Sequence, residues 1–266
     1  YFGPNAGPLT EDNADTAAQT ALLQGLLAEL EHVPDMVSAS VYTPFSPTGD
    51  PARAACEAAM PDALVIDRFT QFLDLDEAAW DKKTRYDIRR GAKLGLTVSD
   101  EADPERFEAF HALYAANCAD RGIPMKDRDV VRDVFTGGLE SGNAVFLTAL
   151  LDGDVVGGLL VLHSRATASY YIPCADDEHR SLQPGMLLID RAVDILRERG
   201  VRWWNWEGSP SRESGVYRFK KRWGSAEADY SIHVLPYREP GFYRALGPDE
   251  LARQFPHFFV YPFDRL

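Results

Sequence analysis

Residues 203–224, WWNWEGSPSRESGVYRFKKRWG, decide the fold that the sequence predicts. An apolar run ends at Trp206, and a turn that contains Gly208 and Pro210 follows it. Aromatic and cationic residues then alternate from Tyr217 to Trp223. The pattern predicts a strand, a Gly/Pro turn and a short basic helix. Backbone amides at such a turn can face an anion, and the cations beside them can meet a phosphate or a developing oxyanion.

The segments on either side of this stretch predict a mixed sheet. We expect strands at residues 96–101, 143–151, 155–163, 167–174, 201–206 and 230–235, and helices at 104–121, 127–139, 184–199 and 214–222. Gly153, between two aspartates, indicates a tight hairpin between two of these strands. Three antiparallel strands therefore precede a helix and a strand that runs parallel to the third. Such a sheet can open where its parallel pair meets, which leaves backbone groups for a ligand.

The first 93 residues predict fewer strands. We expect helices at 10–31, 51–60 and 76–93, and strands at 37–43 and 63–75 with a break at 67–68. Thr10 and Asp76 are the predicted N-caps of the first and last of these helices. Five leucines are expected to form the buried stripe of the first helix: Leu22, Leu23, Leu26, Leu27 and Leu30. Residues 236–266 are rich in Pro and aromatics, and we expect them to pack on the surface as a tail.

Composition limits the class of protein. The 266 residues are long enough for a sizeable core. The sequence contains no stretch of eighteen apolar residues, so it predicts no membrane span. Three scattered cysteines argue against a disulfide framework or a zinc site and fit a reducing cytoplasm. The six histidines show no metal-ligand spacing. The chain starts at Tyr1 without Met, so we expect a start that is processed or cut from a longer chain.

Two basic clusters stand out in an acidic chain. The net charge of −13 excludes nucleic-acid binding through the overall charge, so a polyanion would need a local patch. One cluster lies at residues 82–93 and includes Arg85, Arg89 and Lys93, spaced by four; the other lies at residues 218–222. A solvated helix face is the alternative for each. We favour a functional role for the second cluster and leave both interpretations open for the first.

Three stretches resemble one known family. They are TRYDIRRGAKLGLTV at 84–98, RSLQPGMLLIDRAVDILRERGV at 180–201 and GVYRFKKRWG at 215–224. Their order and the predicted elements resemble the GNAT acyltransferase fold, and the local sequences resemble its FemABX-like peptidyltransferases. The resemblance implies an α/β fold, of the α+β kind, that is built on a mixed sheet. It further implies a partial first GNAT-like domain at 1–80, a complete second one at 81–237 and a C-terminal tail at 238–266.

The resemblance also implies a reaction. Members of this family transfer an aminoacyl group, usually from aminoacyl-tRNA, to an amine on a cell-wall precursor peptide, and relatives use acyl-CoA. Lys220 matches the family's lysine after Phe, which is implied to stabilise the transition state; the alternative is a surface lysine beside Lys221. Tyr217 is expected either to position the substrate or to belong to the core. Arg85, Arg89, Lys93, Tyr217 and Lys221 are our candidates for binding the acceptor or the tRNA.

Donor binding is expected at the start of the helix at 184–199. The candidates that would hold a pyrophosphate or a tRNA 3′ phosphate are Arg180, Gln183, Gly185 and Met186. Pro184 removes one amide donor, which weakens the acyl-CoA interpretation; the alternative is an ordinary helix start.

Residues 205–208 depart from the family pattern. The family more often has Asp-Phe-Gly-Gly where this chain has Asn-Trp-Glu-Gly. Asn205 cannot act as a base, whereas Glu207 can take the proton of the amine. A rim carboxylate paired to an arginine is the alternative for Glu207. Trp203, Trp204 and Trp206 are expected either to stack on a base or to belong to the core.

Together these observations predict a cytoplasmic aminoacyltransferase. It would form an amide between an activated aminoacyl group, expected on aminoacyl-tRNA, and an amine acceptor such as a cell-wall precursor peptide or a small metabolite. We expect no metal, no tightly bound cofactor and no covalent enzyme intermediate. An acyl-CoA-dependent GNAT N-acyltransferase and a non-catalytic GNAT-like binding domain are the two alternatives.

Overall fold

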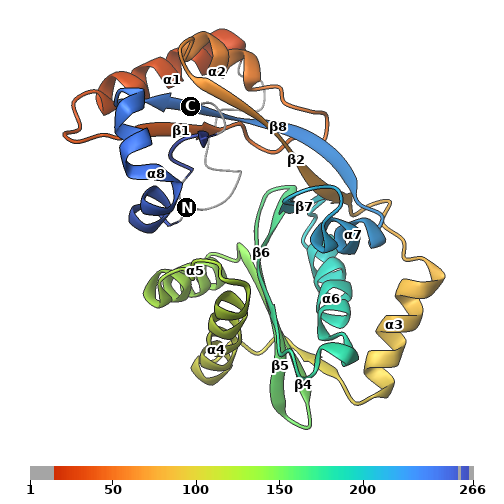
Figure 1. Cartoon of the computed structure of the whole chain (residues 1–266). Coiled ribbons are helices and arrows are strands. Elements are labelled where there is room, and N and C mark those ends of the chain that lie inside the picture. Colours follow the sequence, from red (N-terminus) through yellow and green to blue (C-terminus); the bar gives the residue numbers. More distant parts are fainter. Residues whose placement is uncertain (1–14, 257–258, 264–266) are drawn as a thin grey trace. The chain divides into compact units, whose positions relative to one another are not determined.

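The computed structural model describes residues 15–256 and 259–263, which form two compact units (Figure 1). The described residues of unit 1 come from Tyr1–Thr70, Glu207–Ser209 and Glu227–Leu266. Unit 2 consists of Gln71–Trp206 and Pro210–Ala226. The assignment of 1–80, 81–237 and 238–266 to two GNAT-like domains and a tail stays a prediction.

A mixed sheet forms the centre of unit 2. Its strand order is β2-β7-β6-β5-β4-β3. The bounds are β2 Leu64–Asp74, β3 Thr97–Ser99, β4 Ala144–Leu151, β5 Asp154–Ser164, β6 Thr167–Ala175 and β7 Trp203–Gly208. Strands β3 to β6 pair antiparallel, and β6 pairs parallel with β7. The mixed sheet that the sequence predicted is therefore confirmed.

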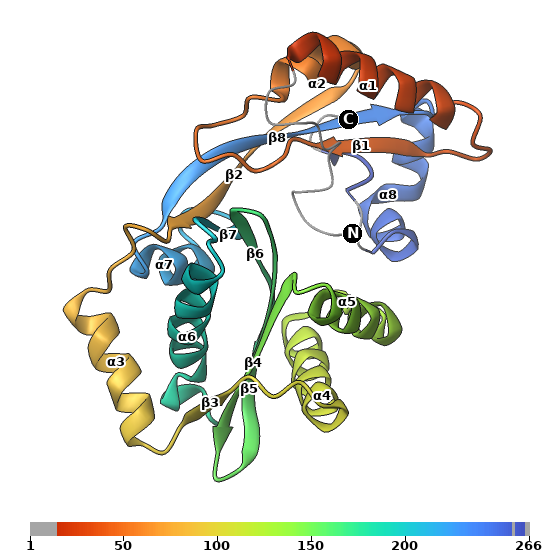
Figure 2. The same cartoon turned by 180° about the vertical axis from the view of Figure 1, so that it is seen from behind.

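Helices cover both faces of this sheet. Helices α4 (Pro104–Arg121) and α5 (Arg128–Glu140) lie on one face (Figure 2). On the other face lie α3 (Lys82–Lys93), α6 (Pro184–Glu198) and α7 (Gly215–Arg222), with the short helix η1 (Arg180–Leu182) before α6. Two apolar cores result, one between the sheet and α6 and one between the sheet and α4 with α5. The layers place the start of α6 and the whole of α7 on the same face.

Unit 1 is built on β1 (Ser38–Tyr42), β8 (Ala226–Pro236) and the first part of β2. Strands β1 and β8 pair antiparallel, with Ser38 opposite Pro236 and Tyr42 opposite Ile232. Helices α1 (Thr16–Leu30) and α2 (Arg53–Ala59) share an apolar core with β1. Helix α8 (Pro240–Gln254) packs the fully buried Tyr243 in a separate core.

The predicted N-caps needed correction. Helix α3 begins at Lys82, and its cap is Asp81, whose carboxylate accepts from the Thr84 amide at 2.6 Å. Asp76 is therefore not the cap. The indole of Trp80 donates to Asp190 on α6 at 2.5 Å, and this tertiary contact holds the residues before α3 outside the helix. The cap of α1 is Asp15, and Thr10 lies outside the described residues.

Two other expectations were also wrong. Leu22 and Leu26 are each 47% exposed, whereas Leu23, Leu27 and Leu30 on the neighbouring face of α1 pack in the core shared with β1. Strand β2 is continuous and has no break at 67–68. The segment predicted as a C-terminal tail, an assignment that stays a prediction, contains α8, which is kinked at Gly247 before Pro248.

Candidate functional site

The parallel strands β6 and β7 are paired over a short distance in unit 2. The ladder joins three residue pairs and ends at Ser169 opposite Asn205. Strand β6 continues to Ala175, and β7 continues to Gly208. Directly after the last pair, the rings of Tyr170 and Trp206 lie 4.9 Å apart. The two strands therefore meet through side chains at the point where the sequence predicted an opening.

An aromatic cluster surrounds Trp206 on the face that carries α6 and α7. Trp204 stacks on Trp206 with 5.1 Å between the ring centroids and an interplanar angle of 4°. The rings of Phe219 and Trp223, both from the α7 segment, lie 6.3 and 6.2 Å from Trp206. Trp204 and Trp206 are at most 1% exposed, so they belong to the core and cannot stack on a base. We call Tyr170, Trp204, Trp206, Phe219 and Trp223 the aromatic cluster.

Trp203 lies on the opposite face of β7. Its ring contacts Phe72 at 5.7 Å, and the Arg202 guanidinium lies over it at 4.4 Å. Side chains alternate along a strand, so Trp203 points away from the cluster that contains Trp204 and Trp206.

The first turn of α6 brings three donor candidates together. Gln183 is the N-cap with a left-handed backbone (φ 58°, ψ 53°), and Pro184 follows it. The Met186 amide donates to the Gln183 carbonyl at 3.0 Å, and the Met186 side chain is 2% exposed. Pro184 has no N–H, so Gly185 supplies the amide of this turn best placed for an anion. Gln183, Gly185 and Met186 are therefore together, but the Met186 side chain belongs to the core.

Arg180 does not turn toward α6. Its guanidinium pairs with Asp177 at 2.6 Å, and the side chain is 63% exposed. An exposed pair of this kind is weak, so Arg180 can reorient toward an anion at low energetic cost.

The two neighbouring lysines of α7 differ in their exposure to solvent. Ser214 caps the helix by accepting from the Tyr217 amide at 3.1 Å. Lys220 is 3% exposed, whereas Lys221 is exposed and donates to the Ser225 carbonyl at 3.1 Å. Lys220 thus points inward, as expected from its position after Phe219. Its catalytic role stays a prediction.

Tyr217 is partly buried on α7. Its carbonyl accepts from the Gln71 side-chain amide at 3.2 Å, and the same amide donates to the Ser225 hydroxyl at 3.0 Å. Gln71 thus ties β2 to both ends of the α7 segment. No sequence pattern singles out Gln71, because one polar residue inside a predicted strand belongs to no recognisable motif.

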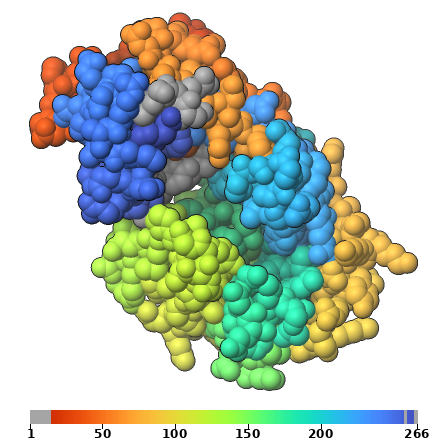
Figure 3. Space-filling model, viewed as in Figure 1, coloured from red at the N-terminus to blue at the C-terminus, as the bar shows by residue number. Residues whose placement is uncertain are grey.

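Helix α3 carries the first basic cluster on its exposed side. Six cations occupy it: Lys82, Lys83, Arg85, Arg89, Arg90 and Lys93. Within residues 15–256 and 259–263, none of the six forms an ion pair, and Arg90 donates to the Ser181 carbonyl at 3.3 Å. Tyr86, on the same helix, is 64% exposed. The gold side chains of α3 project from the surface in Figure 3.

Two contacts hold α3 in place. Asp87 on α3 forms an ion pair with Arg222 on α7, in which both side chains are less than a quarter exposed. A Cβ on Gly91 would lie 2.6 Å from Leu187 Cδ1, so α3 approaches α6 as closely as a glycine allows. The structure therefore brings Arg85, Arg89 and Lys93 onto an element that is fixed to the helix of Lys220.

Glu207 belongs to unit 1, near the end of β7. Its φ of 64° lies in the left-handed region, which costs a residue with a side chain about 1–3 kcal/mol. A Cβ on Gly208 would lie 3.3 Å from the Tyr230 hydroxyl. Burial raises the pKa of Tyr230; the Glu207 charge adds to this shift, and Arg68 opposes it. Glu207 therefore shares its surroundings with Tyr230 and Arg68, neither of which the sequence singled out.

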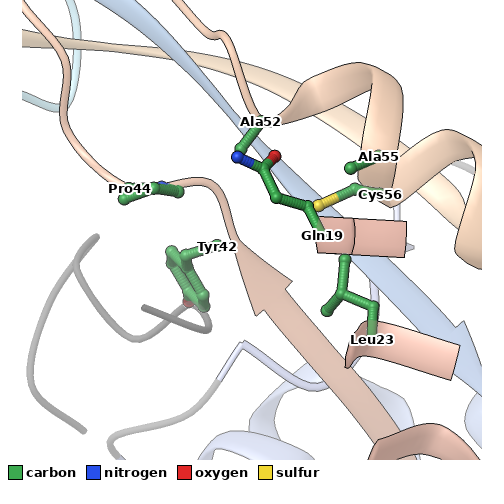
Figure 4. Close-up of a pocket in the computed structure, with 7 residues that line it drawn as sticks. All are labelled: Gln19, Leu23, Tyr42, Pro44, Ala52, Ala55 and Cys56. Atoms are coloured by element: carbon green, nitrogen blue, oxygen red, sulfur yellow. The ribbon is translucent and has the colours of Figure 1, made fainter. Parts of the chain in front are cut away.

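A small pocket in unit 1 is not a substrate site. Its volume is about 30 Å³, which is room for water but not for a substrate. It is lined by Gln19, Leu23, Tyr42, Pro44, Ala52, Ala55 and Cys56 (Figure 4). Burial raises the pKa of the Cys56 thiol to about 11, so it is not a nucleophile at neutral pH.

The described residues contain neither a candidate metal cluster nor a helix suited to cross a membrane. Among residues 15–256 and 259–263, no group of three or more His, Cys, Asp or Glu side chains is arranged to hold a metal ion. No helix in that part of the chain has the length and apolar character needed to cross a membrane.

Comparisons with known proteins agree with this architecture. The family model described as "Acetyltransferase (GNAT) domain" matches residues 81–221. The structure is similar to that of FemX, with 15% identity over 88% of this chain and 80% of FemX, and a TM-score of 0.64. It is also similar to the C-terminal domain of a protein named as a lysylphosphatidylglycerol synthetase from Agrobacterium fabrum, with 13% identity, coverage of 90% and 79%, and a TM-score of 0.65.

A third similar structure is a GCN5-related N-acetyltransferase from Kribbella flavida, with 14% identity, coverage of 85% and 77%, and a TM-score of 0.53. No curated protein sequence matches the chain. At these identities the solved structures establish a common fold.

Proposed function

The chain belongs to the GNAT acetyltransferase domain family, and we propose that within it the protein transfers an aminoacyl group from aminoacyl-tRNA to an amine. Acyl transfer is the chemistry of the family. The tRNA donor rests on one observation, the unpaired basic side of α3 in a chain with a net charge of −13. Cations in such number on an acidic protein suit a polyanionic partner, because each can displace a counterion from a phosphate.

The similar structures support this choice. The name lysylphosphatidylglycerol synthetase describes a product that carries an aminoacyl group, and FemX has the same fold. We propose an amine acceptor, such as a cell-wall precursor peptide or a small metabolite. We also propose a cytoplasmic location, since charged tRNA is found there.

The reaction needs three things from the protein. The acceptor amine loses a proton and attacks the ester carbonyl, so a C–N bond forms and the ester C–O bond breaks. The ribose oxygen leaves and takes up a proton, which makes it a hydroxyl. Charge develops on the carbonyl oxygen, and we assign its stabilisation to the buried side chain of Lys220. Glu207 stays our candidate for the base that takes the amine proton.

We assign binding of the donor to α3 and α7. Arg85, Arg89 and Lys93 contact the RNA phosphates, and Tyr217 and Lys221 lie on the helix that carries Lys220. Gln183 and Gly185 at the start of α6, with Arg180 before it, offer donors to the phosphate nearest the ester.

The test uses charged tRNA. The protein is incubated with tRNA that carries a labelled amino acid, each amino acid in turn, and with an amine-bearing cell-wall precursor peptide. We expect label to appear in an amide product and ribonuclease to abolish the transfer. Amide formation from acyl-CoA that survives ribonuclease would contradict the proposal. Such a result would favour the second candidate, an acyl-CoA N-acyltransferase, which the GCN5-related neighbour supports.

The non-catalytic alternative is separated by the same assay. A GNAT-like binding domain would bind charged tRNA or peptide without transfer from either donor. Tight binding with no product after hours of incubation would therefore contradict the proposed catalysis and favour a binding protein.

A further inference from the structure

The aromatic cluster fills the place where strands β6 and β7 part. The last residue pair of the ladder is Ser169 with Asn205, and the next residues on the face of α6 are Tyr170 and Trp206. Their ring centroids are 4.9 Å apart, which is a contact distance for aromatic rings. A linear substrate arm that entered between the strands on this face would have to displace one of these rings.

Each side of Trp206 is occupied by another ring. Trp204 covers one side by stacking, and Trp223 and Phe219 contact it from α7. Trp204, Trp206 and Trp223 are each at most 1% exposed, so these three rings are closely packed in the part of the chain that the structure describes. Trp80 packs edge-on against Trp223 at 4.8 Å and extends the packing toward α3.

Tyr170 also helps to fill the gap between β6 and β7. Its ring lies 5.9 Å from Trp204 as well as 4.9 Å from Trp206. Burial raises its pKa far above the ordinary tyrosine value, so its hydroxyl stays neutral at any physiological pH. The side chain is therefore a neutral component of the packed core between the two strands.

The start of α6 packs closely against its neighbours on the side of the sheet and of α3. A Cβ on Gly157 of β5 would lie 3.1 Å from Pro184, and a Cβ on Gly91 would lie 3.1 Å from the Leu182 carbonyl. Pro184 has no N–H, and the Met186 amide already donates to Gln183. A diphosphate, which needs several amides in a row, finds few of them at this helix start.

We propose that Trp206 and Tyr170 determine donor specificity by closing the gap between β6 and β7 to a linear thioester arm such as that of CoA. This rests on the proposed function and deepens it, because it names the class of donor. The protein accepts a donor whose activated carbonyl reaches the strand ends without passing between the strands. An ester on the terminal ribose of an RNA meets that condition.

The experiment measures binding of CoA and acetyl-CoA to the full chain by calorimetry, with quenching of tryptophan fluorescence as a second readout. We expect no saturable binding to the wild-type protein. Trp206→Ala removes the central ring of the cluster, and we expect CoA to bind this variant about tenfold or more tightly than the wild type. Trp203→Ala is the matched control, because it removes a tryptophan from the opposite face of the same strand. We expect it to bind no CoA.

Saturable binding of CoA to the wild type, with the affinity unchanged in Trp206→Ala, would overturn the proposal. A folded Trp206→Ala that binds CoA no better than the wild type would overturn it as well. If Trp206→Ala does not fold, Trp206→Leu and Tyr170→Ala take its place with the same expectation.

Failure of this inference can be told from failure of the proposed function. If CoA binds the wild type while label still passes from charged tRNA, the inference is wrong and the function holds. If CoA does not bind and no label is transferred, the proposed closure of the gap between β6 and β7 holds. The proposed transfer from charged tRNA is then wrong.

Discussion

Lys220 and Lys221 are neighbours in sequence with opposite surroundings. Lys220 is 3% exposed, and Lys221 is exposed on the other side of α7. If Lys220 stabilises the oxyanion, Lys220→Ala should lower kcat by about 10²- to 10³-fold, the usual cost of one such donor. The transfer of labelled amino acid in single-turnover reactions measures this effect.

Lys221→Ala is the matched control for this prediction. It removes the same charge from the next position and one hydrogen bond to Ser225, and we expect kcat to change less than threefold or so. Equal losses in the two variants would show that the charge of α7 matters rather than the position of Lys220.

Two adjacent glycines on α5 should respond to alanine with opposite signs. A Cβ on Gly137 meets nothing within 4 Å, whereas a Cβ on Gly138 would lie 2.8 Å from the Ala144 Cβ. We expect Gly137→Ala to raise the free energy of unfolding by about 0.5–1 kcal/mol, because alanine loses less entropy in a helix. Gly138→Ala should lower it by about 1–3 kcal/mol through overpacking.

Urea denaturation at constant pH measures both changes. A stabilised Gly138→Ala would mean that α5 can move away from β4 at little cost. That outcome would contradict the close packing of this helix on the sheet.

At the level of single residues, local pattern predicted orientation but not tertiary partners. The inward direction of Lys220 followed from its place after Phe219. The cap of α3 could not be found, because Trp80 excludes the preceding turn from the helix through its bond to Asp190. Trp206 stayed ambiguous in sequence, since its burial depends on rings from β6 and α7.

Helix α3 is the element on which the choice of donor depends. The triple variant Arg85→Gln, Arg89→Gln and Lys93→Gln keeps helix-forming side chains and removes three exposed cations. We expect weaker tRNA binding at every salt concentration. The plot of log K against log salt concentration has a negative slope, and the magnitude of this slope should decrease by about 2–3. Each lost phosphate contact removes about 0.7–0.9 from that magnitude.

Filter binding of charged tRNA from low to high salt checks this slope. The matched control is Arg128→Gln with Arg132→Gln on α5, where exposed arginines already pair with Glu108 and Asp129. An unchanged slope in the triple variant would remove α3 from the RNA-binding surface and leave it a solvated helix face.

Elements with a local signal were predicted closely, whereas elements that depend on distant contacts were not. Helix α4 was predicted at its observed bounds, because Pro104 starts it and Gly122 ends it with a left-handed backbone. Helix α8 was missed, since Gly247 and Pro248 interrupt its pattern. Its place in the fold comes from Tyr243, which stacks on Tyr261 at 4.1 Å and has no periodic partner in sequence.

At the scale of the whole molecule, two buried histidines and one half-buried histidine tie stability to pH. Burial lowers the pKa of His111, His163 and His233. The Arg128 charge adds to the shift at His111 and the Arg199 charge to that at His163, whereas Asp50 and Glu57 oppose it at His233. Each histidine is thus held neutral in the folded chain at a pH where an exposed histidine is protonated.

The sign of the pH dependence follows from these shifts. The unfolded chain takes up protons near pH 6.5, before the folded chain does, so the free energy of unfolding should fall as the pH drops below about 7. Each histidine can add up to about 1.4 kcal/mol per pH unit to this slope until its folded pKa is passed.

Urea denaturation between pH 8 and 5 measures the dependence of the free energy of unfolding on pH. His163→Gln should flatten it. A free energy of unfolding that stays constant over this range would contradict the neutral state of all three histidines.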